Sequence, residues 1–182
     1  MEKSSLRSLS PEAETSGKRI VLKKGRYVTT RKGDFVIGLS RRLINFLKPF
    51  CKRIEIVGSI RRKEKNPVDI DIVLIPKNRE RLEDFLKKKG KFIQGGEKKS
   101  RWRIEGVNVE LYYTTTESFG ATLLAYSSKF GAGIGLRLVA KRKGYKLNQY
   151  GLFDRRGKQI AGKTETEIYH ALGREWKIPE NR

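Results

Sequence analysis

Cysteine and histidine are almost absent from this sequence, which contains one residue of each type, Cys51 and His170. A disulfide framework, a Cys/His zinc site and any site with two histidine ligands are therefore excluded. A metal ion bound by this chain must be held by carboxylates, which favours a hard cation such as Mg²⁺ or Mn²⁺.

Long apolar runs are also absent. No segment approaches the ~18 consecutive apolar residues that a membrane-spanning helix needs, and residues 1–19 lack the apolar centre of a signal peptide. We therefore expect a soluble, intracellular protein with no membrane partner. We also expect a monomer. The sequence does not specify the compartment or the host, and a viral or microbial origin is compatible with it.

Acidic residues are scarce relative to basic ones. The 182 residues include 42 Lys and Arg against 20 Asp and Glu, a formal net charge of +22. Solubility alone requires a net charge of only about 2 to 8 in a small domain. The excess predicts a polyanionic partner, and nucleic acid is the first candidate. A merely well-solvated basic surface is the alternative.

Hydrophobic periodicity and turn signals divide the sequence into three parts. Residues 1–34 are expected to form a basic tail, partly disordered, or a short hairpin around Gly25. Residues 35–116 are expected to open with a helix over 35–50, with Asp34 as its N-cap, and to continue as strands around one further helix.

Residues 117–182 change in character. Two helical segments are followed by short strands, and a final helix opens with a capping box in which Thr164 and Glu167 satisfy each other's backbone amides. The predicted fold class is α+β: a mixed β-sheet with covering helices, followed by a small helix-rich C-terminal lobe.

The stretch GSIRRKEKNPVDIDIVLIP, residues 58–76, concentrates the polar chemistry. Residues i and i+2 of a strand face the same side, so Asp69 and Asp71 project together at the start of a buried strand. Two carboxylates this close repel each other unless a cation lies between them, which predicts a site for Mg²⁺ or Mn²⁺. The alternative is a surface strand end whose aspartates pair with Arg61 or Arg62.

The same stretch contains a candidate phosphate-binding turn. Gly58 permits close approach of a ligand to the backbone, Ser59 adds a hydroxyl donor, and Arg61 and Arg62 offer forked guanidinium donors that suit phosphate oxygens. Cation-binding carboxylates shortly after such a turn predict a site for a metal-bound nucleoside triphosphate.

A third carboxylate is expected from the alternating strand VNVELYY, residues 107–113. Glu110 would face the two aspartates if this strand neighbours theirs. Two metal ions ~3.5–4 Å apart would then activate an attacking hydroxyl and stabilise a leaving pyrophosphate. An ordinary solvated strand residue is the alternative for Glu110.

The motif GSIRR followed by DIDIVLI resembles the signature of the nucleotidyltransferase superfamily, and particularly of the X-family DNA polymerases that fill short gaps in repair. Further segments, over 117–153 and 162–182, are similar to the end of that family's palm, its nucleotide-selecting lobe and its C-terminal segment. The resemblance implies a palm over 35–116 and the nucleotide-selecting lobe over 117–182. A lysine-bearing lyase domain and a helix-hairpin-helix domain are not recognised, so a compact form of the family is expected.

The resemblance also implies roles for single residues. Asp69, Asp71 and Glu110 would be the catalytic metal ligands, for Mg²⁺ or its substitute Mn²⁺. The triphosphate would be held by Gly58, Ser59 and Arg62. The sugar and base pocket would be lined by Tyr126, Ser127 and Gly133. The DNA-binding residues would be Arg137, Lys141, Arg142, Lys143, Lys146, Asn148 and Tyr150. Lys141 and Arg142 have an alternative role in stabilising the negative C-terminal pole of a helix.

The implied activity is DNA-directed DNA polymerisation: addition of a dNTP to a primer 3′ hydroxyl in gapped or primer-template DNA, with a DNA ligase as functional partner. Two departures qualify it. The first is Glu110, which stands where the family normally has Asp. The second is the nucleotide pocket: AYSSK, residues 125–129, replaces an aromatic pair followed by Thr-Gly-Ser, and Gly133 replaces an Asn. We therefore expect weaker discrimination against ribonucleotides and looser base selection. The alternatives are a template-independent nucleotidyltransferase acting on DNA or RNA ends, and a non-catalytic basic nucleic-acid-binding protein.

Overall fold

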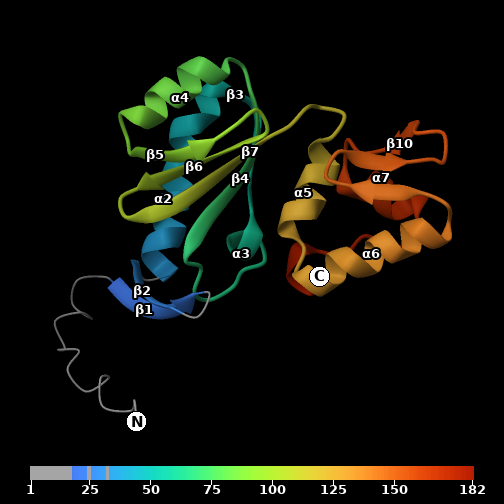
Figure 1. Ribbon diagram of the computed structural model, residues 1–182, viewed down its shortest axis with the longest axis horizontal. Helices are drawn as coiled ribbons and strands as arrows, with labels where there is room; N and C mark the ends of the chain where they lie inside the picture. Colours follow the sequence, from blue (N-terminus) through green and yellow to red (C-terminus); the bar gives the residue numbers. More distant parts are fainter. Residues whose placement is uncertain (1–17, 24–25, 32) are drawn as a thin grey trace, which may run out of the picture.

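The computed structural model describes residues 18–23, 26–31 and 33–182 (Figure 1). Strands β1 (Lys18–Lys23) and β2 (Arg26–Arg31) pair antiparallel, as the hairpin prediction required, although the predicted turn at Gly25 and the tail over 1–17 lie outside the described residues. Among the helices of the described ranges, none combines the length and the apolar character needed to cross a membrane.

The main layer is a mixed five-stranded sheet, which confirms the predicted fold class. Its strand order is β3-β4-β7-β6-β5; β4 and β7 run parallel and the other neighbours antiparallel. A two-residue turn at Glu105 and Gly106, with φ of +46° and +78°, joins β6 to β7. The strand bounds are β3 (Cys51–Val57), β4 (Asp69–Pro76), β5 (Lys91–Gly95), β6 (Lys99–Ile104) and β7 (Val107–Tyr113).

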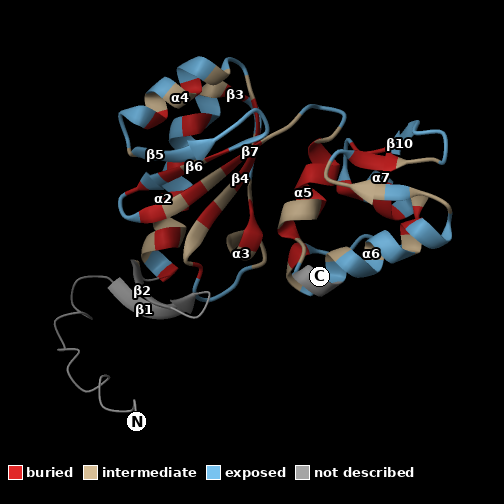
Figure 2. Ribbon diagram, in the orientation of Figure 1, coloured by how far each residue is buried: buried red, intermediate tan, exposed pale blue. Residues whose placement is uncertain are grey.

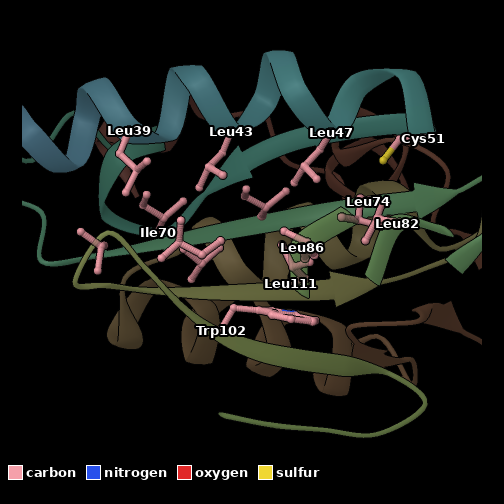
Figure 3. Close-up of a cluster of buried hydrophobic side chains, with 14 of the residues drawn as sticks. Leu39, Leu43, Leu47, Cys51, Ile70, Leu74, Leu82, Leu86, Trp102 and Leu111 are labelled. Atoms are coloured by element: carbon pink, nitrogen blue, oxygen red, sulfur yellow. The ribbon is translucent and has the colours of Figure 1, made fainter. Parts of the chain in front are cut away.

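Helices α2 (Gly33–Leu47) and α4 (Arg79–Lys87) cover one face of this sheet. Side chains at helical spacing on α2, among them Leu39 and Leu43, point onto Ile70 of β4, as Figure 3 shows. Trp102 of β6 is fully buried in the same cluster.

The prediction that Asp34 caps the first helix is wrong. The helix already begins at Gly33, and Asp34 lies inside its first turn, where a negative charge interacts favourably with the helix dipole. The helix is followed directly by a 3₁₀ turn, η2 (Lys48–Phe50), because Pro49 removes a backbone donor there.

Helix α5 (Phe119–Ser127) covers only part of the opposite face. Phe119 and Leu123 pack against Val73 and Ile75, the residues of the second half of β4 that alternate with those facing α2. Figure 2 shows α5 largely buried between the sheet and the C-terminal elements. The first half of the strand, which carries the two aspartates, extends beyond this cover.

The remaining elements form a second, smaller group. A three-stranded antiparallel sheet, in the order β10-β9-β8, packs with α6 and α7 around Leu152, Ile168 and Leu172. The predicted capping box of Thr164 and Glu167 is present at the start of α7. The bounds are α6 (Phe130–Arg142), β8 (Lys146–Asn148), β9 (Gly151–Phe153), β10 (Gln159–Ala161), α7 (Glu165–Ala171) and η3 (Pro179–Asn181).

Because α5 packs both on the large sheet and on α7, a boundary between two lobes at residue 116 stays a prediction.

Candidate active site

The three candidate metal-binding carboxylates lie on one face of the large sheet. The parallel register of β4 on β7 pairs Asp71 with Glu110, and Asp69 with Asn108. All three carboxylates are partly exposed, because α5 covers only the later residues of these strands. The strand of Glu110 therefore lies beside the strand of the two aspartates, as the predicted site requires.

Gly58 lies directly against Asp71. The antiparallel pairing of β3 with β4 sets Val57 opposite Asp71, so the turn that follows β3 begins beside this carboxylate. Gly58 has a φ of +66°, and a Cβ atom added to it would lie 2.2 Å from Asp71 Oδ2. Glycine is thus required here by the packing of a carboxylate on the backbone, a reason that the sequence pattern did not reveal.

The electrostatics of Asp71 reflect its burial beside two other carboxylates. Burial, followed by the charges of Asp69 and Glu110, raises the pKa of Asp71 to about 6, against the opposing effects of a hydrogen bond from Tyr112 and the charge of Arg62. A carboxyl with this pKa gains from any cation placed beside it.

Glu110 has the opposite electrostatics, because donors surround it. Arg101 Nε donates to Glu110 Oε1 at 2.8 Å, and Arg101 Nη2 donates to the same oxygen. The Tyr112 hydroxyl lies 2.7 Å from Glu110 Oε2 and 3.2 Å from Asp71 Oδ1. Burial would raise the pKa of Glu110, but the hydrogen bonds from Tyr112 and Arg101 and the charge of Arg101 hold it below its usual value.

Both oxygens of Glu110 are therefore engaged by neighbouring side chains. Within the described ranges, no group of three acidic, His or Cys side chains is arranged as a ready-made metal site. The two aspartates and Glu110 share a face, but Glu110 is turned toward Arg101.

The candidate phosphate turn forms the short helix α3 (Gly58–Arg61). Ser59 is partly exposed in it. Arg62 follows the helix and donates from Nε and Nη2 to Glu64 Oε1, at 2.9 and 2.8 Å, and from Nη1 to the backbone oxygen of Ser127 at 3.3 Å. Its guanidinium thus lies between the turn and the end of α5.

Arg61 points away from the aspartates and joins the turn to α7. Its guanidinium forms a two-pronged pair with Glu165, at 2.8 and 2.9 Å, and donates to Ser127 Oγ at 2.7 Å. Arg182 Nη1 donates to the same carboxylate at 2.6 Å. Burial would raise the pKa of Glu165, but the two arginines hold it below its usual value.

Tyr126, predicted for the sugar pocket, stacks on Tyr112. The two ring centroids are 3.7 Å apart and the rings are inclined by 20°. Because the Tyr112 hydroxyl contacts Glu110 and Asp71, this stack connects the end of α5 to the carboxylates. Ser127, predicted for the same pocket, is buried, and its hydroxyl is occupied by Arg61.

The predicted DNA-binding residues lie on α6 and the strands after it. Gly133 is partly buried near the start of α6. Asn148 Oδ1 accepts from the backbone amide of Tyr150 at 2.8 Å, and Lys98 Nζ lies 4.3 Å from the centroid of the Tyr150 ring, which brings Tyr150 against the loop between β5 and β6. The predicted DNA-binding cations are all exposed: Arg137, Lys141, Arg142, Lys143 and Lys146.

Two residues of the site, Arg101 and Tyr112, escaped the sequence analysis, although the sequence contains a signal for each. A two-residue turn at Glu105 and Gly106 fixes the hairpin register and places Arg101 opposite Glu110. Tyr112 follows Glu110 by two residues in the same strand and therefore shares its face. The pairing of Arg61 with Glu165 is different, since 104 residues separate the two and no local pattern predicts it.

Comparison with known proteins adds independent support. Residues 134–182 match the family described as the DNA polymerase beta thumb. The chain is 31% identical over 147 residues, which is 75% of this chain and 84% of the relative, to Repair DNA polymerase X of African swine fever virus (isolate Tick/South Africa/Pretoriuskop Pr4/1996). It is 27% identical over 172 residues, 85% of this chain and 99% of the relative, to Repair DNA polymerase X of the isolate Pig/Kenya/KEN-50/1950. With the shared sheet face of the carboxylates beside the Gly58 turn, this similarity over most of both chains shows that the chain belongs to the X family of DNA polymerases.

Proposed function

We propose that this chain is a DNA-directed DNA polymerase of the gap-filling repair type, which adds a nucleotide from a dNTP to a primer 3′ hydroxyl and releases pyrophosphate. One observation carries the proposal: the register of β4 on β7 sets Glu110 opposite Asp71, with Asp69 on the same open face. The viral relatives, named as repair DNA polymerases, and the thumb-domain match support the same activity.

Asp69, Asp71 and Glu110 are the proposed ligands for Mg²⁺, with Mn²⁺ as a substitute. Their donors are all carboxylate oxygens, which suit these hard cations. Burial and the neighbouring charges of Asp69 and Glu110 raise the pKa of Asp71, and a bound cation would favour its ionised form. When bound, the metal lowers the pKa of the attacking hydroxyl and stabilises the charge on the leaving pyrophosphate.

Ser59 and Arg62 are proposed to bind the triphosphate at the turn that begins with Gly58. The carboxylate partner of Arg62 is Glu64, whose side chain is 43% exposed, so a triphosphate can replace it while Arg62 Nη1 keeps its bond to the Ser127 backbone oxygen. Arg61 is not available for this role, because Glu165 and Ser127 occupy its guanidinium. Its role is to hold the turn against α7.

Tyr126, Ser127 and Gly133 are proposed to shape the sugar and base pocket. Tyr126 contributes its ring, which Tyr112 supports, whereas Ser127 acts by holding Arg61 and Arg62 rather than by lining the pocket with its hydroxyl. Gly133 presents no side chain to a base. Weak discrimination against ribonucleotides and loose base selection remain the expected result.

The DNA is proposed to lie along α6 and the strands that follow. The residues assigned to its phosphates and bases are those of the sequence analysis: Arg137, Lys141, Arg142, Lys143, Lys146, Asn148 and Tyr150. A filled gap ends in a nick, so a DNA ligase is the proposed functional partner. Because one chain contributes every residue of the site, we propose that it acts as a monomer.

Primer extension on gapped, recessed and single-stranded DNA tests this function, with Mg²⁺ or Mn²⁺ and with deoxy- or ribonucleotides. Asp69→Ala and Asp71→Ala should abolish extension, and Glu110→Gln should remove most of the rate. Asp84→Ala is the matched control, because Asp84 is an exposed carboxylate on α4, paired with Lys87, on the opposite side of the sheet.

Each alternative has its own outcome. Activity that survives both aspartate substitutions would overturn the metal-site assignment. Extension that ignores the template sequence would indicate a template-independent transferase, and DNA binding without incorporation would indicate a non-catalytic protein.

A further inference from the structure

The ion pair between Arg101 and Glu110 has a consequence for the assembly of the metal site. Arg101 directs two N–H groups at Glu110 Oε1, and Tyr112 occupies Oε2. A cation bound through Oε1 would lie against a guanidinium, and like charges this close repel each other. Metal binding by Glu110 is therefore weakened as long as Arg101 holds this carboxylate.

Arg101 is placed to accept another anion in exchange. Its side chain is 37% exposed, whereas that of Glu110 is 19% exposed. It lines a cavity of about 460 Å³ together with Glu110 and with two further cations, Lys98 and Lys99. A guanidinium binds phosphate oxygens with the same fork that it offers to a carboxylate, so the exchange replaces one charged partner by another.

The order of the strands identifies which phosphate this is. The triphosphate turn follows β3, on one flank of β4, whereas Arg101 belongs to β6, on the far flank of β7. The carboxylates lie between the two. The anion that reaches Arg101 is therefore distinct from the triphosphate at Gly58, and a phosphodiester of the DNA strand whose 3′ end enters the site fits its position.

We propose that Arg101 is a positioning residue that masks Glu110 in the DNA-free protein and releases it when a phosphate of the primer strand takes its place. Primer binding then completes the set of metal ligands, and metal binding and primer binding strengthen each other to the same extent, as thermodynamic linkage requires. The proposal rests on the polymerase function proposed above.

Equilibrium binding of Mn²⁺, followed by electron paramagnetic resonance without nucleotide, tests the coupling. The protein is titrated alone, with template strand only, and with a gapped duplex whose primer ends in a dideoxynucleotide. For the unmodified protein we expect the primer-containing duplex to raise Mn²⁺ affinity on the order of tenfold, and the template strand alone to raise it little.

Arg101→Gln should bind Mn²⁺ more tightly than the unmodified protein in the absence of DNA, and the primer-containing duplex should add little further affinity. In steady-state extension the same variant should show a higher KM for DNA and half-maximal rate at a lower Mg²⁺ concentration. Arg101→Lys keeps the charge without the fork and should restore part of the coupling.

Arg103→Gln is the matched control. Arg103 lies two residues along β6, on the same face, and bonds to Asn108 rather than to a carboxylate. The Arg103→Gln substitution removes the same charge as Arg101→Gln, but it should keep the coupling between Mn²⁺ binding and primer binding that the unmodified protein shows.

Equal coupling in Arg101→Gln and the unmodified protein, or weaker Mn²⁺ binding by DNA-free Arg101→Gln, would overturn the proposal. A loss of coupling in Arg103→Gln as large as in Arg101→Gln would do the same, because it would reduce the effect to general charge. Failure of the polymerase function has a separate signature: the unmodified protein would not extend a primer.

Discussion

At the scale of single residues, the site depends on how closely the backbone of Gly58 approaches Asp71. We expect Gly58→Ala to lower the free energy of unfolding by about 1 to 3 kcal/mol, because alanine at a φ of +66° is strained and its Cβ would lie 2.2 Å from Asp71 Oδ2. Urea denaturation measures the loss, and primer extension should fall with it.

Gly96→Ala is the control for this substitution, because a Cβ at Gly96 would meet no atom within 4 Å and its φ is not positive. If the two alanine variants unfold at the same urea concentration, the close approach at Gly58 does not constrain the fold.

Asp71 makes the stability of the metal-free protein depend on pH. Below a pH of about 3.8 the carboxyl is protonated in both the folded and the unfolded chain. As pH rises from about 3.8 through the folded pKa of about 6, the unfolded chain loses this proton while the folded chain still holds it, so stability falls across this range and levels off above it. The group should cost on the order of 3 kcal/mol at neutral pH, at about 1.4 kcal/mol per pKa unit.

Asp71→Asn removes this cost. In buffer with a chelator we expect it to be more stable than the unmodified protein at pH 7 and equally stable near pH 4, although it should not extend a primer. Urea unfolding at several pH values measures the difference, and a constant gap between the two curves across this range would contradict the prediction.

At the scale of elements, the start of α7 is stabilised by the capping box that the sequence predicts. Thr164 and Glu167 form the predicted capping box of α7, with the Glu167 amide donating to Thr164 Oγ1 at 3.2 Å. We expect Thr164→Ala to destabilise the protein by about 1 kcal/mol in urea unfolding, because a backbone donor at the helix start loses its acceptor.

Thr166→Ala is the comparison, since Thr166 lies inside the same helix and its hydroxyl contacts Thr164 Oγ1 rather than an amide. It should cost clearly less than Thr164→Ala. A larger loss for Thr166→Ala would show that the cap does not stabilise this helix.

At the scale of the whole molecule, a cluster of the buried Glu165 and Arg182 with the partly exposed Arg61 joins the phosphate turn to the C-terminal elements. The side chain of Glu165 is 6% exposed and that of Arg182 is 1% exposed. Glu165→Gln leaves these cations without their shared carboxylate and should cost about 3 kcal/mol in urea unfolding, since removal of one partner from a buried pair is strongly destabilising.

Glu180→Gln provides the contrast, because Glu180 pairs with Lys63, whose side chain is 79% exposed. Exposed ion pairs contribute little, so this variant should unfold almost as the unmodified protein does. Equal losses for the two glutamine variants would mean that the cluster does not hold the molecule together.

The net charge of +22 predicts salt-sensitive DNA binding. Each phosphate contact on duplex DNA contributes about 0.9 to the slope of log affinity against log salt concentration. Lys141→Gln should reduce this slope by about that amount in fluorescence anisotropy titrations. Lys87→Gln, a change on α4 that covers the other sheet face, should leave it unchanged. A lower stability without a change of slope would assign Lys141 to the C-terminal pole of α6 instead.

The sequence by itself determined the features that depend on neighbours along the chain. Strand alternation placed Asp69 and Asp71 on one face, and the turn at Glu105 and Gly106 set the hairpin of β6 and β7. The capping box of α7 could be predicted from four consecutive residues, 164–167. These features follow from interactions within a few residues, and the family resemblance agreed with them. The start of the first helix was predicted two residues too late, because local signals define the interior of a helix better than its ends.

Only the tertiary structure decided how distant segments meet. The register that sets Asp71 opposite Glu110 joins two parallel strands separated by a helix and two further strands, so the packing of the whole sheet selects it. Arg61 could have served the aspartates or the phosphate, but the fold brings it to Glu165. Local chemistry specified which residues were available to the site, and the long-range packing of the chain selected their partners.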